Sequence, residues 1–432
     1  MNILYLHCHD AGRFLGPWNR EFPAPNLEKL AKNSTLFTEA FTPSPTCSPS
    51  RGAMLTGTHP HENGLIGLTH LGFRLSHPEW HLAHRLRDRG YQTFLAGIQH
   101  EFQGTEMPYQ QVHPPKTKEP YANKDEETAA GAAEFLKTHA GQAPFLLAVG
   151  FFKPHRGFPK PKSGDHPSPP PGFPDTPEVR NDWQAYRECV ASMDRAAGIV
   201  LDTLARSSFA DNTLVLFTTD HGPPFPAMKC TLRDHGCGVA LMIRPPAGGE
   251  PRVVDATVSH LDVLPTLLDY AGLPSPHPGR GHSLRPWIET GEGPHHERLY
   301  AEINFHASYQ PERAVRTGQW KYIARFEDDL RWPRANTDRG LTKDLLAARG
   351  FYDKSRPSEE LYNLINDPGE TRNLADTPTH AAVKTELRNA LLQWMKDTGD
   401  PLLNGPLPIP TGARLCPREA PSTAEENWVF HE

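Results

Sequence analysis

Short apolar runs alternate with amphipathic segments along the N-terminal two thirds of the chain. The apolar runs have the length and composition of buried strands, at residues 2–6, 93–96, 144–152, 213–218 and 239–243. Apolar residues at helical spacing predict helices over residues 26–37, 79–89, 126–137, 179–205 and 259–270. Strands that alternate with helices predict an α/β fold, with a large mixed, mostly parallel sheet sandwiched by helices.

The pattern changes near residue 295. The stretch ERAVRTGQWKYIARF predicts a β-hairpin that turns at Thr317-Gly318, and residues 383–395 predict an amphipathic helix. The last residues combine Pro, Gly and charge without periodicity, which predicts an extended or disordered tail. We therefore expect a catalytic α/β domain over 1–294, a smaller α+β subdomain with an antiparallel sheet over 295–404, and a tail over 405–432.

Three of the predicted strands end in histidine and acidic or basic side chains. These ends carry His9-Asp10, Asp220-His221 and His155-Arg156. In parallel sheets the functional site forms beyond the carboxyl ends of the strands. A turn-forming aspartate or a surface histidine explains any one of these ends, but all three together favour a metal or acid–base site.

Composition restricts the class of protein. The chain has 432 residues, 37% of them hydrophobic and 22% charged, and a net charge of -6. This balance supports a packed core and argues against bulk nucleic-acid binding, although a local pocket can still bind an anion. No apolar run reaches the roughly 18 residues of a membrane span. We expect a soluble cytoplasmic protein, or a periplasmic or secreted one if a leader was removed.

The six cysteines show neither a CxxC pair nor zinc-like spacing. Free thiols are a simpler interpretation than a bridge between Cys230 and Cys237. Cys47 begins CSPSR, and the following RGAMLTG predicts a helix. The positive potential of a helix N-terminus and of Arg51 favours a thiolate there, or an oxyanion, so Cys47 is a candidate nucleophile. The alternative is a small residue at a loop-to-helix junction.

The motif CSPSR, followed by LTG, matches the C-x-P-x-R motif of type I sulfatases, which belong to the alkaline phosphatase superfamily. Similar stretches cover nearly the whole chain: PNLEKLAKNSTLFTEAF, SHLDVLPTLLDYAGL, RTGQWKYI and ELYNLINDPGETRNLA. Within the family, NGLIGLTH, FFKPHRGF, DHGPPFPAMK and WMKDTGDP resemble the sulfamidase branch. The resemblance implies an alkaline-phosphatase-like fold and a cysteine that a maturation enzyme oxidises to formylglycine.

The resemblance also implies roles for individual residues. It places one divalent metal ion, calcium in most of the family, among Asp10, His9, Cys47, Asp220 and His221. It makes Cys47, Arg51, His100 and His155 catalytic. Substrate contacts are expected from Lys229, Arg156 and His235. Two of these remain open, because His9 either binds the metal or points away, and His235 either contacts substrate or forms a structural turn.

Three positions depart from the family pattern. His9-Asp10 stands where two aspartates are usual, and Asp220-His221 stands where Asp-Asn is usual. Ile98 occupies a position that is usually lysine. Imidazole suits manganese or another transition metal, whereas oxygen ligands suit calcium. The Asp-His pair resembles related phosphonate and phosphodiester hydrolases.

The expected function is metal-dependent hydrolysis of a sulfate ester or sulfamate, on a sulfated amino sugar or glycosaminoglycan fragment. One alternative is a phosphonate monoester or phosphodiester hydrolase on the same scaffold. Another is an inactive carbohydrate-binding homologue, which the intact CSPSR opposes. The oligomeric state stays open.

Overall fold

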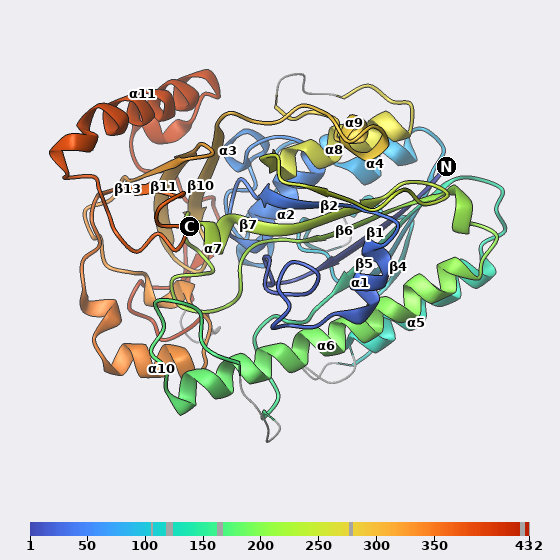
Figure 1. Ribbon diagram of the computed structural model, residues 1–432, viewed down its shortest axis with the longest axis horizontal. Helices are drawn as coiled ribbons and strands as arrows, with labels where there is room; N and C mark the ends of the chain where they lie inside the picture. The colour runs from blue at the N-terminus through green and yellow to red at the C-terminus, as the bar shows by residue number, and fades with distance from the viewer. Residues whose placement is uncertain (105–106, 118–123, 162–166, 276–279, 424–427, 432) are drawn as a thin grey trace.

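A mixed sheet lies at the centre of the larger part of the molecule (Figure 1). The computed structural model describes residues 1–104, 107–117, 124–161, 167–275, 280–423 and 428–431. Within them, nine strands form this sheet: β1 (Asn2–Cys8), β2 (Thr35–Phe41), β3 (Gln92–Gly97), β4 (Gln111–His113), β5 (Phe145–Phe151), β6 (Thr213–Thr219), β7 (Gly238–Arg244), β8 (Arg252–Val254) and β9 (Val258–Ser259). Their order is β4-β3-β5-β1-β6-β7-β2-β8, with β9 beside β2. Only β7 runs antiparallel to its neighbours in this described sheet.

Helices cover both faces of the sheet, as the alternation predicts. One face carries α1 (Pro25–Ala31), α5 (Lys124–Thr138) and α6 (Pro177–Ala205). The other carries α2 (Cys47–Thr56), α4 (Leu82–Arg87), α8 (Val263–Tyr270) and α9 (Arg285–Glu289). Strand β1 is buried on both sides, with Leu4 and Leu6 in the first core and Ile3 and Tyr5 in the second. The predicted α/β sandwich is confirmed.

The prediction of one helix over residues 26–37 is wrong in its second half. Helix α1 ends at Ala31, and β2 begins at Thr35. The Ser34 hydroxyl donates to the Leu30 carbonyl, which satisfies one of the free acceptors at the helix end. Residues 35–37 are β-branched or large and apolar, and β2 gains ladders with both β7 and β8. Tertiary pairing therefore overrides the helical spacing.

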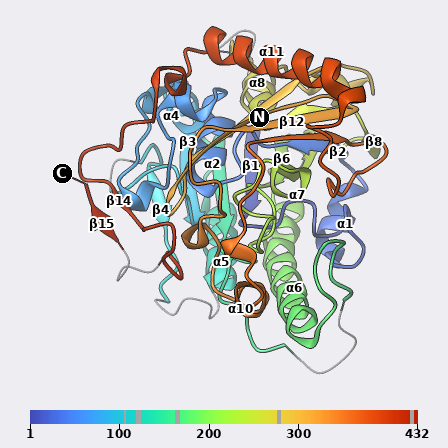
Figure 2. The same ribbon diagram turned by 90° about the vertical axis from the view of Figure 1, so that its left-hand side faces the viewer.

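The C-terminal part contains a second, antiparallel sheet. Its order is β10 (Leu299–Phe305), β11 (Tyr309–Arg316), β12 (Trp320–Arg325) and β13 (Glu359–Asn363). The β11–β12 pair confirms the hairpin predicted around Thr317-Gly318. Helix α11 (Ala381–Asp397) packs its apolar side on one face of this sheet (Figure 2). The other face packs against Phe41 and Leu232 of the α/β part.

The described part of the tail is packed rather than free. Leu407, Ala413 and Leu415 are buried in the same core as α11. Strands β14 (Arg414–Leu415) and β15 (Val429–Phe430) pair with each other, and residues 424–427 and 432 lie outside the described residues. An Arg414 guanidinium nitrogen donates to the His70 carbonyl, so this segment reaches the edge of the main sheet that carries the site.

All six cysteines are free thiols, so the bridge between Cys230 and Cys237 does not form. In the described ranges, each helix is too short or too polar to cross a lipid bilayer.

Candidate active site

The carboxyl ends of β1 and β6 meet the start of α2 at a buried cluster. Cys47 is the first residue of α2 and is 2% exposed. Its Sγ lies 3.3 Å from His221 Nε2 and 4.0 Å from Asp10 Oδ1. The same His221 nitrogen lies 3.3 Å from Asp10 Oδ1. The structure thus brings together the cysteine and the strand-end residues that the sequence singled out.

Asp220 organises this cluster through both carboxylate oxygens. Oδ1 accepts the backbone N–H groups of Asp10, at 2.8 Å, and of His221, at 2.9 Å. Oδ2 accepts from Arg51 Nη2 at 3.1 Å. Burial raises the pKa of Asp220, but the neighbouring His221 ring and the Arg51 guanidinium outweigh it and hold that pKa well below its usual range. Asp220 is therefore a fixed anion that joins β1, β6 and α2.

Asp10 adopts a left-handed backbone conformation, with φ of 51°. This conformation is unfavourable for a residue other than glycine and clusters at functional sites. Its N–H bond to Asp220 holds the strained turn in place and directs the Asp10 carboxylate toward Cys47 and Lys229.

Arg51 acts on Asp220 rather than directly on position 47. Its buried guanidinium donates to Asp220 and, at 3.2 Å, to the Cys8 carbonyl. It also pairs with His7 Nδ1. Burial and the Arg51 charge lower the pKa of His7, so this imidazole is neutral and accepts the bond. Arg51 thereby fixes α2 against the ends of β1 and β6.

The donor set around Cys47 fits a divalent metal ion. Asp10, Asp220, His9 and Cys47 offer ligand atoms that all lie within 4.8 Å of one another. Both ring nitrogens of His9 are buried without a hydrogen-bond partner in the described chain, although Nδ1 lies 3.5 Å from Asp220 Oδ2. His221 Nδ1 donates to the Gly222 carbonyl at 2.9 Å, which leaves the Nε2 lone pair directed at the cluster. Buried lone pairs of this kind need a cation or a hydrogen-bond donor as a partner.

Burial opposes the thiolate that the helix N-terminus favours at Cys47. Burial raises the pKa of the Cys47 thiol, and so do Asp10 and Asp220, which together outweigh the lowering effects of Lys229 and Arg51. The pKa of Cys47 in the protein alone therefore lies well above its usual value. A divalent ion at this position favours the thiolate instead.

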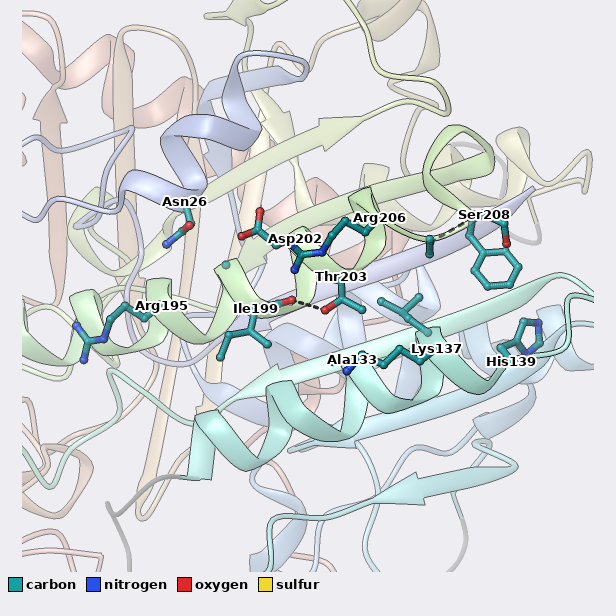
Figure 3. A pocket seen from close by; sticks show the side chains of 14 residues that line it. Asn26, Ala133, Lys137, His139, Arg195, Ile199, Asp202, Thr203, Arg206 and Ser208 are labelled. Atoms are coloured by element: carbon teal, nitrogen blue, oxygen red, sulfur yellow. Dashed lines mark hydrogen bonds between the residues drawn. The ribbon is translucent and has the colours of Figure 1, made fainter.

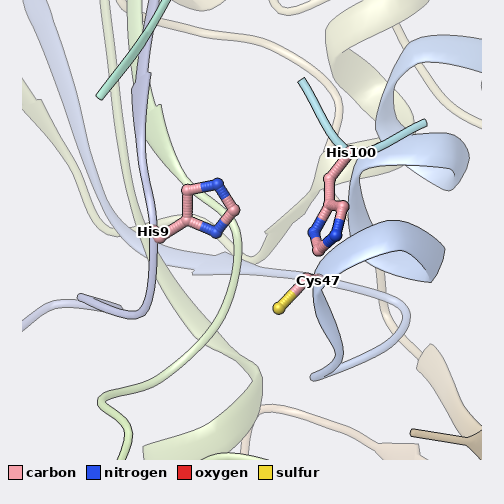
Figure 4. A group of neighbouring side chains, drawn as sticks. All are labelled: His9, Cys47 and His100. Atoms are coloured by element: carbon pink, nitrogen blue, oxygen red, sulfur yellow. The ribbon is translucent and has the colours of Figure 1, made fainter. Parts of the chain in front are cut away.

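His100 completes the cluster from the end of β3. Figure 4 shows the rings of His9 and His100 on either side of Cys47. Cys47 Sγ and a ring nitrogen of each histidine lie within 4.8 Å of one another. His100 Nε2 lies 3.2 Å from His70 Nδ1, and the two rings stack with their centroids 5.3 Å apart. Burial holds the pKa of His100 well below its usual value, so the ring is neutral.

Lys229 lies at the opposite side of Asp10. Its Nζ is 3.0 Å from Asp10 Oδ2 and 2.9 Å from Asp338 Oδ2. His155 Nε2 is 3.8 Å from the same Asp10 oxygen, and the His155 side chain is 26% exposed. His155 is therefore the member of this group with access to solvent and to a bound substrate.

Two predicted substrate residues have partners within the protein. The Arg156 guanidinium is buried, pairs with Asp182 through both carboxylate oxygens and donates to the Pro224 carbonyl at 2.9 Å. His235 packs against Phe14 and lines a separate pocket of about 430 Å³. These contacts give both residues a structural role, and contact with substrate stays a prediction.

An open groove of about 720 Å³ lies between α5 and α6 (Figure 3). Its lining includes Lys137, Arg195 and Arg206. These residues lie in the C-terminal halves of the helices that lead into β5 and β6, at the amino ends of the strands. The groove is therefore at the wrong edge of the sheet for the site around Cys47.

Sequence reasoning missed three residues around the site: His70, His306 and Asp338. His70 belongs to NGLIGLTH, a stretch that the family resemblance had marked without naming its histidine. Burial holds the pKa of His306 well below its usual value. The charge of Lys229 also lowers this pKa and that of Asp338 raises it, which places His306 beside the same two residues. Asp338 has no local signal, because only the packing of the C-terminal part brings it to Lys229.

The fold and this cluster define an alkaline-phosphatase-like α/β hydrolase. The Sulfatase family model matches residues 12–273. N-sulphoglucosamine sulphohydrolase of Homo sapiens is 29% identical, over 94% of this chain and 92% of that protein. The chain belongs to the Sulfatase family, a family of sulfuric ester and sulfamate hydrolases.

Solved structures share the fold. A protein in complex with its substrate, D-glucosamine-2-N,6-O-disulfate, has a TM-score of 0.74 at 18% identity, covering 94% of this chain and 99% of that one. The phosphonate monoester hydrolase of Silicibacter pomeroyi has a TM-score of 0.67 at 20% identity, with 92% and 95% coverage. The architecture therefore occurs with more than one substrate chemistry.

Arg156→Ala should destabilise the fold, because it leaves the buried Asp182 carboxylate unpaired. We expect a loss of about 3–5 kcal/mol in unfolding free energy, measured by urea denaturation. Arg180→Ala is the matched control, because Arg180 pairs with Asp175 at the exposed surface, and its loss should leave the unfolding free energy nearly unchanged. A raised KM with unchanged stability in Arg156→Ala would instead support a substrate contact.

Proposed function

We propose that this chain removes sulfate from the nitrogen or an oxygen of a sulfated amino sugar, with position 47 as the nucleophile. The observation that carries the proposal is the buried position of Cys47 at the start of α2, 3.3 Å from His221 and 4.0 Å from Asp10. The human relative that acts on N-sulphoglucosamine supports the amino-sugar class. A glycosaminoglycan fragment is the polymeric form of that class.

Oxidised to formylglycine by a maturation enzyme, position 47 presents an aldehyde hydrate whose hydroxyl supplies the attacking oxygen. The high pKa of the Cys47 thiol supports this assignment, because the unmodified side chain is a weak nucleophile at neutral pH. Asp10, Asp220 and His221, with His9 as a further ligand, would hold a divalent ion, which would supply Lewis-acid stabilisation of negative charge there.

The protein's own side chains provide the remaining chemistry. Lys229 holds a fixed positive charge beside Asp10 and stabilises the anionic group that is transferred. His155 protonates the leaving nitrogen or oxygen from the solvent-accessible side. His100 accepts a proton at the position 47 side of the site, since its ring is neutral and its Nδ1 is buried without a partner in the described residues.

We further propose that the metal is manganese or another transition ion rather than calcium. His221 directs a free nitrogen lone pair at Asp10 and Cys47, and His9 adds two unsatisfied ring nitrogens among the described residues. Two imidazoles beside two carboxylates suit a transition ion, whereas calcium prefers six to eight oxygens.

Phosphonate monoester hydrolysis is a second candidate activity. Two features favour it: His221 in the Asp-His pair, and Ile98, which leaves the site without the lysine that the family resemblance predicts there. Without that lysine, the site has fewer positive charges with which to select a sulfuryl group. It can therefore also bind another singly charged ester, such as a phosphonate monoester.

A substrate panel tests the proposed function. N-sulfoglucosamine, an aryl sulfate and an aryl phosphonate are compared by kcat/KM, and we expect N-sulfoglucosamine to be the best substrate. Cys47→Ala should lower the rate by at least about 10³-fold because the nucleophile is lost. Its melting temperature should stay near that of the wild type. Retained turnover in this variant contradicts the nucleophile assignment, and a preference for the phosphonate favours the second candidate.

Metal exchange tests the ligand set. After treatment with a chelator, we expect Mn²⁺ to bind more tightly than Ca²⁺, measured by calorimetry on the folded protein. His221→Asn replaces an imidazole by an amide and should weaken Mn²⁺ binding by about 10–100-fold, with little effect on Ca²⁺. His235→Asn is the control, because His235 lies in a separate pocket. Equal losses for both ions, or no loss, would contradict the assignment of His221 as a ligand.

A further inference from the structure

Asp338 reaches the site from the C-terminal part of the chain. It lies on the segment between β12 and α10 (Leu341–Ala348), and its carboxylate pairs with Lys229 at 2.9 Å. Ligand atoms of Asp338, His155 and Asp10 lie within 4.8 Å of one another. The Asp338 side chain is only 10% exposed. A second carboxylate therefore lies beside Lys229, the lysine that we propose stabilises the anion.

The segment that carries Asp338 is held at both ends. Lys343 Nζ donates to the carbonyls of Arg334, at 2.9 Å, of Pro421, at 2.7 Å, and of Thr337. On the other side, the Thr342 N–H donates to Asp182 Oδ2 at 3.0 Å.

The buried Arg156–Asp182 pair therefore supports this segment rather than the substrate. Gly340 lies directly against the Arg156 guanidinium, where a Cβ atom would come within 2.4 Å of Nη1. Asp338 is consequently fixed in place, and its charge is a permanent feature of the site.

The charge of Asp338 opposes an incoming anion. Lys229, which we propose stabilises the transferred anion, is flanked by Asp10 on one side and Asp338 on the other, so an anion bound beside Lys229 also meets the negative charge of Asp338. Coulomb energy scales with the charge of the ligand, so a fixed carboxylate repels a dianion twice as strongly as a monoanion at the same position. Sulfate esters, sulfamates and phosphonate monoesters carry one charge on the transferred group, whereas a phosphate monoester carries up to two.

We propose that Asp338 is a specificity-determining residue that selects singly charged sulfuryl groups over doubly charged phosphoryl groups. The proposal rests on the proposed function for the identity of the site. It does not require turnover, because selection between anions is a property of binding.

Calorimetry with two small anions tests this selection. Metal-loaded wild-type protein is titrated with the sulfamate ion and with inorganic phosphate at about pH 8, where phosphate is mostly a dianion. We expect wild type to bind sulfamate more tightly. In Asp338→Asn, phosphate affinity should rise relative to sulfamate by about tenfold.

Two variants separate charge from structure. Asp338→Glu keeps the charge and should keep the wild-type ratio. Asp194→Asn changes another buried carboxylate, which accepts backbone hydrogen bonds at the start of α1 and is not part of the site. This variant should leave the ratio unchanged. Circular dichroism confirms that each variant is folded.

An unchanged ratio in folded Asp338→Asn, or equal changes for both anions, would overturn the proposal. If that variant does not fold, tighter binding of phosphate than sulfamate by the wild type would overturn it, and the reverse order supports it. Anion selection without hydrolysis of any sulfated substrate would reject the proposed function alone. Hydrolysis of sulfate without anion selection would reject this inference alone.

Discussion

The buried carboxylate of Asp220 is the constraint on which the rest of the site depends. It accepts hydrogen bonds from the backbones of Asp10 and His221 and from the Arg51 guanidinium. These bonds fix the left-handed turn after β1, the end of β6 and the first turn of α2. An uncompensated charge at this depth would be costly, so the arrangement requires Arg51, whose guanidinium pairs with Asp220.

A second set of contacts closes the site from the C-terminal part. Lys229 lies between Asp10, on the main sheet, and Asp338, on the segment before α10. The Arg156–Asp182 pair supports that segment. The smaller part of the molecule thus places a carboxylate next to Lys229, and the role that we propose for Asp338 would connect its packing to the choice of substrate.

The sequence predicted the elements that depend on local patterns. Buried strands, the long helix α6 and the hairpin at Thr317-Gly318 followed from periodicity and turn residues, and Cys47 followed from its motif. Local patterns failed where partners far along the chain decide the outcome. Residues 35–37 form a strand because β7 and β8 pair with them. Burial and the charges of Asp10 and Asp220 raise the pKa of the Cys47 thiol, an effect that the residues next to it in the sequence do not indicate.

The part of the site that lies at the strand ends could be predicted, because parallel strands place their last residues at the same edge of the sheet. Asp10, Asp220 and His221 met there as expected, whereas Asp338 required the folded position of a segment more than a hundred residues away from Lys229. The buried pairing of Arg156 with Asp182 had no signal in the local sequence either, because Asp182 lies on α6.

The most direct test of the account is the mass of the peptide that contains Cys47, taken from active wild-type protein. The account predicts a peptide in which the thiol has been replaced by an aldehyde, in a fraction that rises with specific activity and with coexpression of a maturation enzyme. Full activity in a preparation that contains only unmodified cysteine at position 47 would contradict it.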